Sequence, residues 1–220
     1  EEQLGRLELN LRTGNIHQDG SPEPIDLRLD DLYLSLSTQE FQWTQHDAAN
    51  AAMALARRNA FDPAKQYLDG IKAEPLQAEQ WERLDLHLLG TEDRLAARAL
   101  QRFLVSAVAR VYEPGCYVRL VPVLVGPQER GKSTLGKILF GESLWVEGVG
   151  AMDRDALQKC HTAWGVELAE LDGVTRRADL EHMKAFLTET ADTFRAPYER
   201  RPERCRRRFV FWGTANRAPL

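Results

Sequence analysis

An apolar run followed by a glycine-rich loop is the feature that most constrains how this chain can fold. Leu120 to Val125 is continuously apolar, and residues 126–133 then read Gly-Pro-Gln-Glu-Arg-Gly-Lys-Ser. The apolar run predicts a buried parallel strand, and Lys132 to Phe140 is predicted to be a helix. The loop matches the pattern G-x-x-x-x-G-K-[ST] at every fixed position, in the strand–loop–helix context that the pattern requires.

This loop predicts a binding site for a nucleoside triphosphate. Glycines allow backbone N–H groups to turn toward phosphates, and the following helix presents the positive end of its dipole to them. Lys132 is expected to contact the β- and γ-phosphates and Ser133 to bind Mg²⁺, so ATP and Mg²⁺ are the expected cofactors. The alternative is a glycine-rich turn without a ligand. The predicted nucleotide-binding residues are Gly126, Pro127, Gln128, Glu129, Arg130, Gly131, Lys132, Ser133 and Thr134.

The remainder of the C-terminal half alternates short apolar runs with helical segments. Strands are predicted at 144–146, 163–168 and 209–212, and helices at 153–160 and 180–187. Such alternation is typical of an α/β layer with a parallel sheet. We therefore predict an α/β fold of the P-loop NTPase class, with its core in residues 116–220.

The N-terminal half has two different patterns. Leu7 to Leu11 alternates at period two and is followed by a turn at 13–15, which predicts a short hairpin within residues 1–26. Residues 27–115 have mainly helical periodicity and form the predicted helical subdomain ahead of the core.

Several residues in that subdomain mark where its helices begin and end. Thr44 and Asp47 form a capping signature ahead of an alanine-rich helix, and Pro63 begins another. Thr91 is expected to cap a longer helix that stops at Pro114.

Acidic and amide side chains follow two of the predicted core strands. A phosphate-loop ATPase needs a carboxylate beyond a neighbouring strand, to position Mg²⁺ and polarise water. Glu170 lies at the carboxyl end of its strand, where ligands bind in open α/β sheets, so it is favoured over Glu167 and is the predicted metal ligand beside Ser133. Asn216 follows the last strand and is expected to orient the attacking water, or alternatively to cap a turn. The predicted catalytic residues are Lys132, Glu170, Glu167 and Asn216.

One segment of the chain is strongly basic. Between Arg195 and Arg208 there are seven arginines and two glutamates, a net charge of +5, whereas the rest of the chain carries about −9. Such a segment suits the phosphate backbone of DNA. The alternatives are an arginine finger that acts on a neighbouring subunit and a solvated surface run. The predicted DNA contacts are Lys184, Arg195, Arg200, Arg201, Arg204 and Arg206.

The composition narrows the remaining possibilities. Three widely spaced cysteines without a CxxC pair indicate free thiols in a reducing cytoplasm. The sequence has no stretch long and apolar enough to span a membrane, and its five histidines have no metal-ligand spacing. The chain begins without Met and stops just after a predicted core strand, so it is interpreted as a piece of a larger protein.

The order of many short segments from Phe61 to Asn216 resembles the virulence-associated E family of phages and mobile elements. Residues 1–60 carry little of this resemblance. The matching segments are 62–68 (DPAKQYL), 89–93 (LGTED), 107–116 (AVARVYEPGC), 125–128 (VGPQ), 167–171 (ELAEL), 184–188 (KAFLT), 192–198 (DTFRAPY) and 213–216 (GTAN).

The resemblance implies a relative of the superfamily 3 helicases within the AAA+ group. A member of this group is expected to form a hexameric ring and to translocate on DNA, with a hairpin in the basic segment facing the pore. The sequence departs from the family in two places, because position 129 is Glu where the family often has Gly, and the family's segment beyond Asn216 is missing.

Three functions are consistent with these sequence features. The first is a replicative DNA helicase or initiator ATPase, the second a P-loop kinase, and the third a nucleotide-gated DNA-binding or regulatory module that does not hydrolyse ATP. The absence of an obvious acceptor site, together with Asn216 after the last strand, favours the ATPase over the kinase. Glu129 in the loop keeps the third alternative open.

Overall fold

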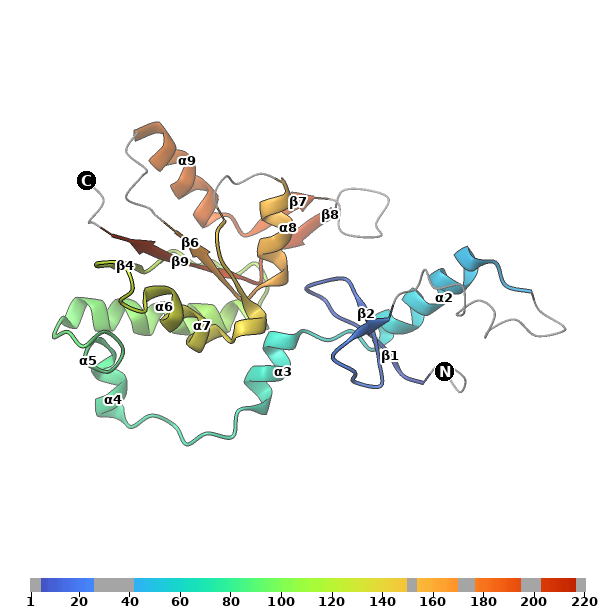
Figure 1. The fold of residues 1–220 in the computed structure, drawn as a ribbon, viewed down its shortest axis with the longest axis horizontal. Coiled ribbons are helices and arrows are strands. Elements are labelled where there is room, and N and C mark those ends of the chain that lie inside the picture. Colours follow the sequence, from blue (N-terminus) through green and yellow to red (C-terminus); the bar gives the residue numbers. More distant parts are fainter. Residues whose placement is uncertain (1–4, 26–41, 150–153, 170–176, 195–202, 217–220) are drawn as a thin grey trace. The chain divides into compact units, whose positions relative to one another are not determined.

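The chain folds as two compact units, residues 1–69 and 70–220, and each is described by itself. The computed structural model describes residues 5–25, 42–149, 154–169, 177–194 and 203–216 (Figure 1). Within these ranges no helix is both long and apolar enough to cross a bilayer. The boundaries predicted near residues 26 and 115 stay a prediction, because a division by packing does not test where a functional subdomain ends.

The first unit is a small antiparallel sheet with a helix packed on it. The predicted hairpin is confirmed, because β1 and β2 pair antiparallel with Leu9 opposite Ile16. Helix α2 presents Ala48, Ala52 and Ala56 to the sheet, and these small buried residues let the helix approach closely. Thr44 caps α2 by accepting a hydrogen bond from the Asp47 amide, as predicted (3.2 Å). The elements of this unit are β1 (Leu7–Leu9), β2 (Ile16–Gln18), β3 (Pro24–Ile25), α2 (Gln45–Arg58) and α3 (Pro63–Gly70).

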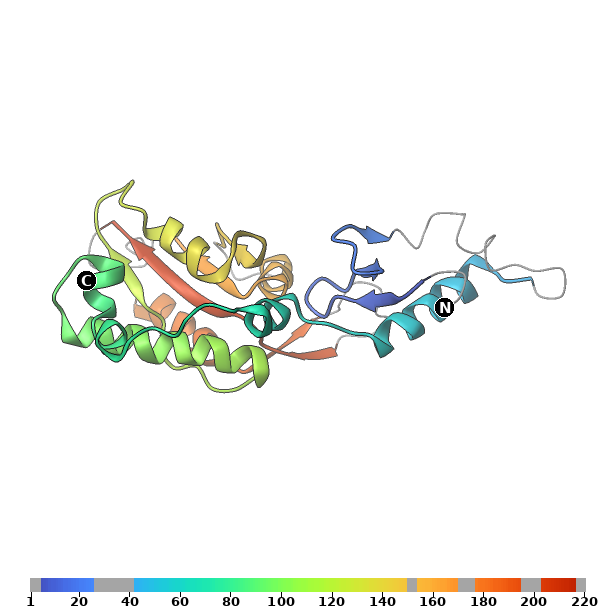
Figure 2. The same cartoon turned by 90° about the horizontal axis from the view of Figure 1, so that it is seen from below.

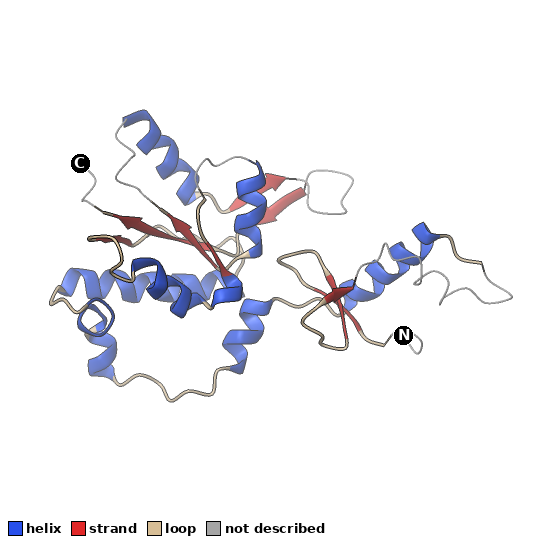
Figure 3. Ribbon diagram, in the orientation of Figure 1, coloured by secondary structure: helices blue, strands red, loops and turns tan. Residues whose placement is uncertain are grey.

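The second unit is a mixed α/β domain built around a four-stranded parallel sheet (Figure 3). The strand order is β4-β9-β6-β5, with every neighbouring pair parallel. The predicted alternation of strands and helices is therefore confirmed. Its helices are α4 (Ala78–Glu82), α5 (Leu84–Leu89), α6 (Arg94–Tyr112), α7 (Lys132–Phe140), α8 (Arg154–Thr162), α9 (Arg177–Thr188) and the 3-10 turn η1 (Glu142–Leu144). Its strands are β4 (Val123–Val125), β5 (Trp145–Val146), β6 (Gly165–Leu168), β7 (Ala191–Phe194), β8 (Glu203–Arg206) and β9 (Val210–Ala215).

Helices cover both faces of this sheet, with α8 and α9 on one side and α6 and α7 on the other (Figures 1 and 2). Successive residues of a strand point to opposite faces. Val166, Leu168 and Phe211 belong to the buried cluster that also contains Cys160 of α8. The intervening residues Glu167 and Trp212, which are partners in the β6–β9 register, belong to the face of α6 and α7. This alternation places Glu167, the acidic residue of β6, on the face of the sheet that meets α7.

Strand β4 differs from its prediction as a buried strand. Val123 and Val125 are 38% and 51% exposed, and within the described residues β4 pairs with β9 alone. The sequence prediction of burial is wrong here because β4 lies at an edge of the sheet, where its side chains have neighbours on one side only. The strand itself is predicted correctly, although it is shorter than the apolar run.

A cluster of aromatic rings joins α6 and α7 to the sheet. Phe140, at the end of α7, stacks on Trp145 with ring centroids 5.8 Å apart and meets Trp164 edge-on at 5.0 Å. Phe103 of α6 contacts both Phe140 and Trp212, and Trp164 Nε1 donates to the Ala107 carbonyl of α6 (2.9 Å). These contacts bury the large residues of α6, α7, β5 and β9, together with Trp164 just before β6, in one core.

Helix α6 begins two residues later than the sequence predicts. Asp93, not Thr91, is its N-cap, because the Asp93 carboxylate accepts hydrogen bonds from the amides of Leu95 and Ala96 (2.8 and 3.2 Å). An aspartate also complements the positive end of the helix dipole better than a threonine does. The predicted cap at Thr91 is therefore wrong.

A buried ion pair anchors the hairpin of β7 and β8 to the domain. Arg207, which is fully buried, donates to both carboxylate oxygens of Asp192 (2.7 and 2.6 Å) and lies 4.3 Å from the Phe186 ring centre. His161 Nε2 of α8 lies 2.9 Å from the same carboxylate. Burial alone would raise the pKa of Asp192, but hydrogen bonds with His161 and Arg207 and the arginine charge lower it to about 2.

A second buried arginine connects this hairpin to helix α6. Arg110 donates to the carbonyls of Cys116 (3.0 Å), Phe209 (3.0 Å) and Glu189 (3.3 Å). Burial lowers the pKa of Arg110, and the three carbonyls satisfy the guanidinium group that burial removes from water. Arg110 therefore binds α6, the segment before β9 and the segment before β7 together.

Gly136→Ala tests the close packing of α7 on β5. An added Cβ would overlap the buried Trp145 ring, which has no room to move because it is stacked on Phe140. Alanine normally stabilises a helix relative to glycine, yet we expect a loss of about 1–3 kcal/mol in the free energy of unfolding, measured by urea denaturation. Gly70→Ala is the control, because a Cβ added there would meet nothing within 4 Å. A Gly136→Ala protein as stable as the wild type would contradict this packing.

Asp192→Asn tests the buried ion pair through the pH dependence of stability. The folded pKa of about 2 lies below the ordinary value of 3.8, so Asp192 stabilises the fold above pH 4 and loses this effect as the pH falls toward 2. We expect the variant to be about 3–5 kcal/mol less stable at pH 7, because the buried Arg207 loses the carboxylate that it contacts most closely. The difference from wild type should shrink between pH 4 and pH 2 in urea titrations. Asp155→Asn, at an exposed site, is the control, and a difference that does not change with pH would exclude this role of Asp192.

Candidate functional site

The glycine-rich loop connects β4 to the first turn of α7. Gly131, with φ of +74°, occupies the N-cap of α7, and no side chain caps the helix. The left-handed conformation is one that glycine adopts without strain. The first amides of α7 have no acceptor within the helix and point toward the loop, which is the arrangement that binds anions at helix N-termini. The Gly126 amide donates to the Ala215 carbonyl (3.2 Å), which attaches the loop to β9.

Lys132 lies inside the curve of this loop. Its Nζ donates to the carbonyls of Gly126 (2.7 Å) and Pro127 (2.8 Å) and lies 3.5 Å from Asn216 Oδ1. The structure thus brings together Lys132 and Asn216, two of the four predicted catalytic residues, which are 84 positions apart. A positive charge held by carbonyls at a helix N-terminus is available to an anionic ligand.

Glu167 joins the sheet to the start of α7. Glu167 Oε1 accepts hydrogen bonds from Ser133 Oγ (2.7 Å) and Thr214 Oγ1 (2.9 Å). The residue is only 4% exposed, although it carries a carboxylate. A buried charge is costly unless it is hydrogen-bonded or binds a cation. The two hydroxyl groups that donate to Glu167 therefore stabilise its carboxylate in this buried position.

The preference for Glu170 over Glu167 depends on where the strand ends. Strand β6 ends at Leu168, and Glu170 lies outside the described residues, so its predicted role stays a prediction. Glu167 is the residue that the structure places beside Ser133. A signal for Glu167 is present in the sequence, because a lone charge inside an otherwise apolar strand is uncommon unless it has a partner.

Thr214 is a site residue that the sequence alone does not single out. It is 6% exposed and reaches Glu167 from the neighbouring strand β9. The strand register explains the contact, because Glu167 pairs with Trp212 and Leu168 with Gly213, so Thr214 extends just beyond the end of β6. Only the register of β6 against β9, which single-sequence reasoning does not give, identifies this neighbour.

Glu129 is the unusual residue of the loop. It has φ of +61°, a left-handed backbone conformation that residues other than glycine, asparagine and aspartate rarely adopt. Its side chain is exposed, as are those of Gln128, Arg130 and Thr134. This backbone conformation explains why the family resemblance leads one to expect glycine at position 129, where this chain has glutamate.

The predicted DNA contacts fall into two groups. Arg204 and Arg206 are exposed on β8 and Lys184 is exposed on α9, whereas Arg195, Arg200 and Arg201 lie outside the described residues. The hairpin implied by the resemblance is present, because β7 and β8 pair antiparallel with Asp192 opposite Cys205. Its orientation toward DNA stays a prediction.

Comparison with known proteins identifies the family of this chain. Among curated proteins no sequence matches the chain. A family model described as the virulence-associated protein E-like domain matches residues 72–219, which is well over half of the chain and includes the loop, Glu167 and Asn216. The similar segment at 62–68 lies outside the match. The chain therefore belongs to the virulence-associated protein E-like family.

Proposed function

We propose that residues 116–220 form a P-loop ATPase core of the AAA+ superfamily 3 type, which follows a helical subdomain and binds ATP and Mg²⁺ at the loop of residues 126–134. The observation that carries this proposal is the hydrogen-bonded group of Ser133, Glu167 and Thr214 at the start of α7. This group lies at the N-terminus of α7 next to Lys132, and both of these suit phosphate. The oxygen atoms of Ser133 and Glu167 suit Mg²⁺.

Different residues of the chain would bind the phosphates and the metal at such a site. The first amides of α7 and Lys132 would bind the phosphates, and Ser133 and Glu167 would hold the metal directly or through water. Mg²⁺, when bound, neutralises charge on the phosphate oxygens. The residues present fit this cation, because Glu167 is a buried carboxylate whose two contacts are hydroxyl donors rather than a cationic side chain.

Asn216 is proposed to position the water that attacks the terminal phosphate. It lies at the end of β9 on the Lys132 side of the site, with its Oδ1 3.5 Å from Lys132 Nζ. An amide can donate to one group and accept from another, so it can hold a water without changing its charge. Glu167 or Glu170 is proposed to polarise the same water.

The ATPase is proposed to serve DNA replication in a phage or mobile element, as a ring-forming helicase or initiator. Family membership supports this setting. The exposed Arg204 and Arg206 on the β7–β8 hairpin support a contact with the DNA backbone. A homohexamer and DNA as the partner are parts of this proposal. The alternative, a nucleotide-gated DNA-binding module without hydrolysis, is favoured by one observation, the strained acidic residue Glu129 in the loop.

Lys132→Ala and Glu167→Gln test the nucleotide site. We expect Lys132→Ala to weaken binding of a fluorescent ATP analogue at least tenfold, because a charged contact with phosphate is lost. We expect Glu167→Gln to retain binding but to lower the rate of ATP hydrolysis about 100-fold or more, measured with single-stranded DNA present. Lys159→Ala, which removes an exposed lysine of α8, is the matched control.

The outcomes separate the two candidate functions. Nucleotide binding without any hydrolysis in the wild type, with or without DNA, would favour the nucleotide-gated module over the motor. Full binding by Lys132→Ala would overturn the assignment of the loop itself.

Glu129→Gly and Glu129→Gln test whether the loop restrains nucleotide binding. Glycine adopts the left-handed backbone conformation without strain and also removes the carboxylate, whereas glutamine removes only the charge. We expect the glycine variant to bind the ATP analogue several-fold more tightly than wild type and the glutamine variant to lie between them. Equal affinities of all three proteins would show that Glu129 does not affect the site.

A further inference from the structure

A row of arginines on the outer face of α6 is a second cationic surface, separate from the hairpin. Arg94, Arg98 and Arg102 are spaced four residues apart, and all three are exposed. Residues at this spacing lie along one face of a helix, about 6 Å apart along its axis. The buried residues of α6, which include Leu100, Phe103 and Ala107, belong to the opposite face. We call Arg94, Arg98 and Arg102 the arginine row.

The arginine row has no acidic partners within the part of the chain that the structure describes. No ion pair joins any of the three to a carboxylate there, although other arginines of the unit, such as Arg83 and Arg207, are paired. Helix α6 contains four arginines and no acidic residue from Arg94 to Tyr112, in a chain whose net charge is −4. A row of like charges without partners costs stability through mutual repulsion, so its presence points to an anionic ligand.

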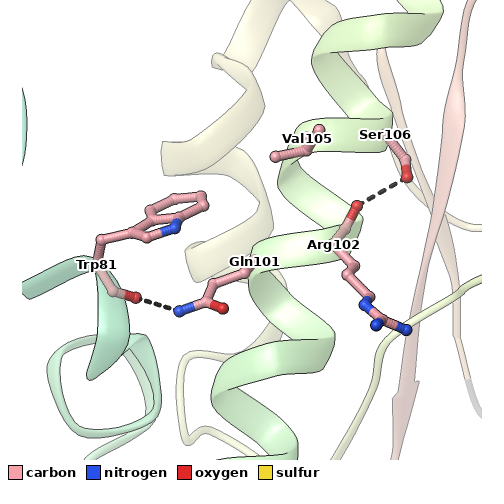
Figure 4. A pocket seen from close by; sticks show the side chains of 5 residues that line it. All are labelled: Trp81, Gln101, Arg102, Val105 and Ser106. Carbon is pink, nitrogen blue, oxygen red and sulfur yellow. Dashed lines mark hydrogen bonds between the residues drawn. The ribbon is translucent and has the colours of Figure 1, made fainter. Parts of the chain in front are cut away.

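An aromatic hollow adjoins the row. Trp81, Gln101, Arg102, Val105 and Ser106 line a hollow of about 400 Å³ between α4 and α6 (Figure 4). Gln101 Nε2 donates to the Trp81 carbonyl (2.6 Å), which fixes α4 against α6 beside the indole. In Figure 4 the Trp81 ring lies on one side of α6 and the Arg102 guanidinium extends to the other. A ligand that contacts both must therefore span this part of α6, and a ligand with a flat apolar group beside an anionic one matches the two side chains.

We propose that the arginine row and Trp81 bind a single strand of nucleic acid, with phosphates on Arg98 and Arg102 and a base against Trp81 and Val105. Proteins that bind single strands without sequence preference combine a cationic track with aromatic side chains on which bases stack. Val105 is 59% exposed, which leaves apolar surface available next to the indole. The exposed glutamates Glu79 and Glu82 of α4 disfavour phosphate near that helix, so the charge contact is assigned to α6.

An acidic protein is the competing ligand for a row of cations. The combination of a flat apolar surface with regularly spaced charges beside it favours the nucleic acid, because each nucleotide supplies one base and one phosphate. Binding of an acidic polypeptide in its place is one outcome of the experiment below.

The experiment measures binding of a fluorescent oligothymidylate to the whole chain by anisotropy, without nucleotide, so its result does not depend on the proposed ATPase. Arg98→Ala/Arg102→Ala should weaken binding at least tenfold and reduce the slope of log K against log salt by about 0.7 for each arginine removed. Trp81→Ala should weaken binding at least fivefold, and Trp81→Phe should restore most of it. The matched control, Arg57→Ala/Arg58→Ala, removes two exposed arginines from α2 and should leave both affinity and slope unchanged.

Three results would overturn the proposal. The first is unchanged affinity and salt slope in the double arginine variant, with its thermal unfolding like that of the wild type. The second is the same loss of affinity in the control variant, which would show an effect of net charge alone. The third is displacement of the oligothymidylate by polyglutamate at equal charge concentration, which would assign the surface to acidic proteins.

Discussion

The burial of Phe140 determines where the glycine-rich loop lies relative to the sheet. Phe140 is the last residue of α7, and its ring contacts Phe103, Trp145, Trp164 and Trp212. Because these rings belong to α6 and to β5, β6 and β9 or their ends, the far end of α7 is fixed against the sheet. The near end of the same helix begins at Lys132, so its position follows from the rigid geometry of one short helix. Ser133 is thereby held within 2.7 Å of Glu167.

The sequence predicted the elements of the core better than their contacts. The helix from Lys132 to Phe140 and the alternation of strands and helices along the chain follow from local patterns, and the structure confirms them. The selection of Glu167 as the neighbour of Ser133 depends on which face of β6 meets α7, and Thr214 depends on the register of β9. Both are tertiary properties, so a single sequence leaves them open. The edge position of β4 was not predicted for the same reason, because apolarity alone does not distinguish a central strand from an edge strand.

The arginine-rich segment shows how a charge pattern in sequence can combine different roles. Arg207 is fully buried and paired with Asp192, while its neighbours Arg204 and Arg206 are exposed on β8. In sequence the three are equivalent members of one basic run. In the fold one of them anchors the hairpin, and the others are available to a ligand. The hairpin is also connected through Arg110 to the segment before β9, the strand that carries Thr214 and Asn216 toward the loop. The segment of Phe209 and β9 is therefore linked to the proposed nucleotide site at one end and, through Arg110, to the base of the basic hairpin at the other.

The central claim is that Ser133 and Glu167 form the metal end of a nucleotide site. The most direct test is a crystal structure of the chain grown with Mg²⁺ and a non-hydrolysable ATP analogue. We predict the triphosphate within the loop of residues 126–133, with the cation bound by Ser133 Oγ and facing the Glu167 carboxylate. A triphosphate bound elsewhere, or a cation distant from both side chains while the nucleotide occupies the loop, would contradict this claim.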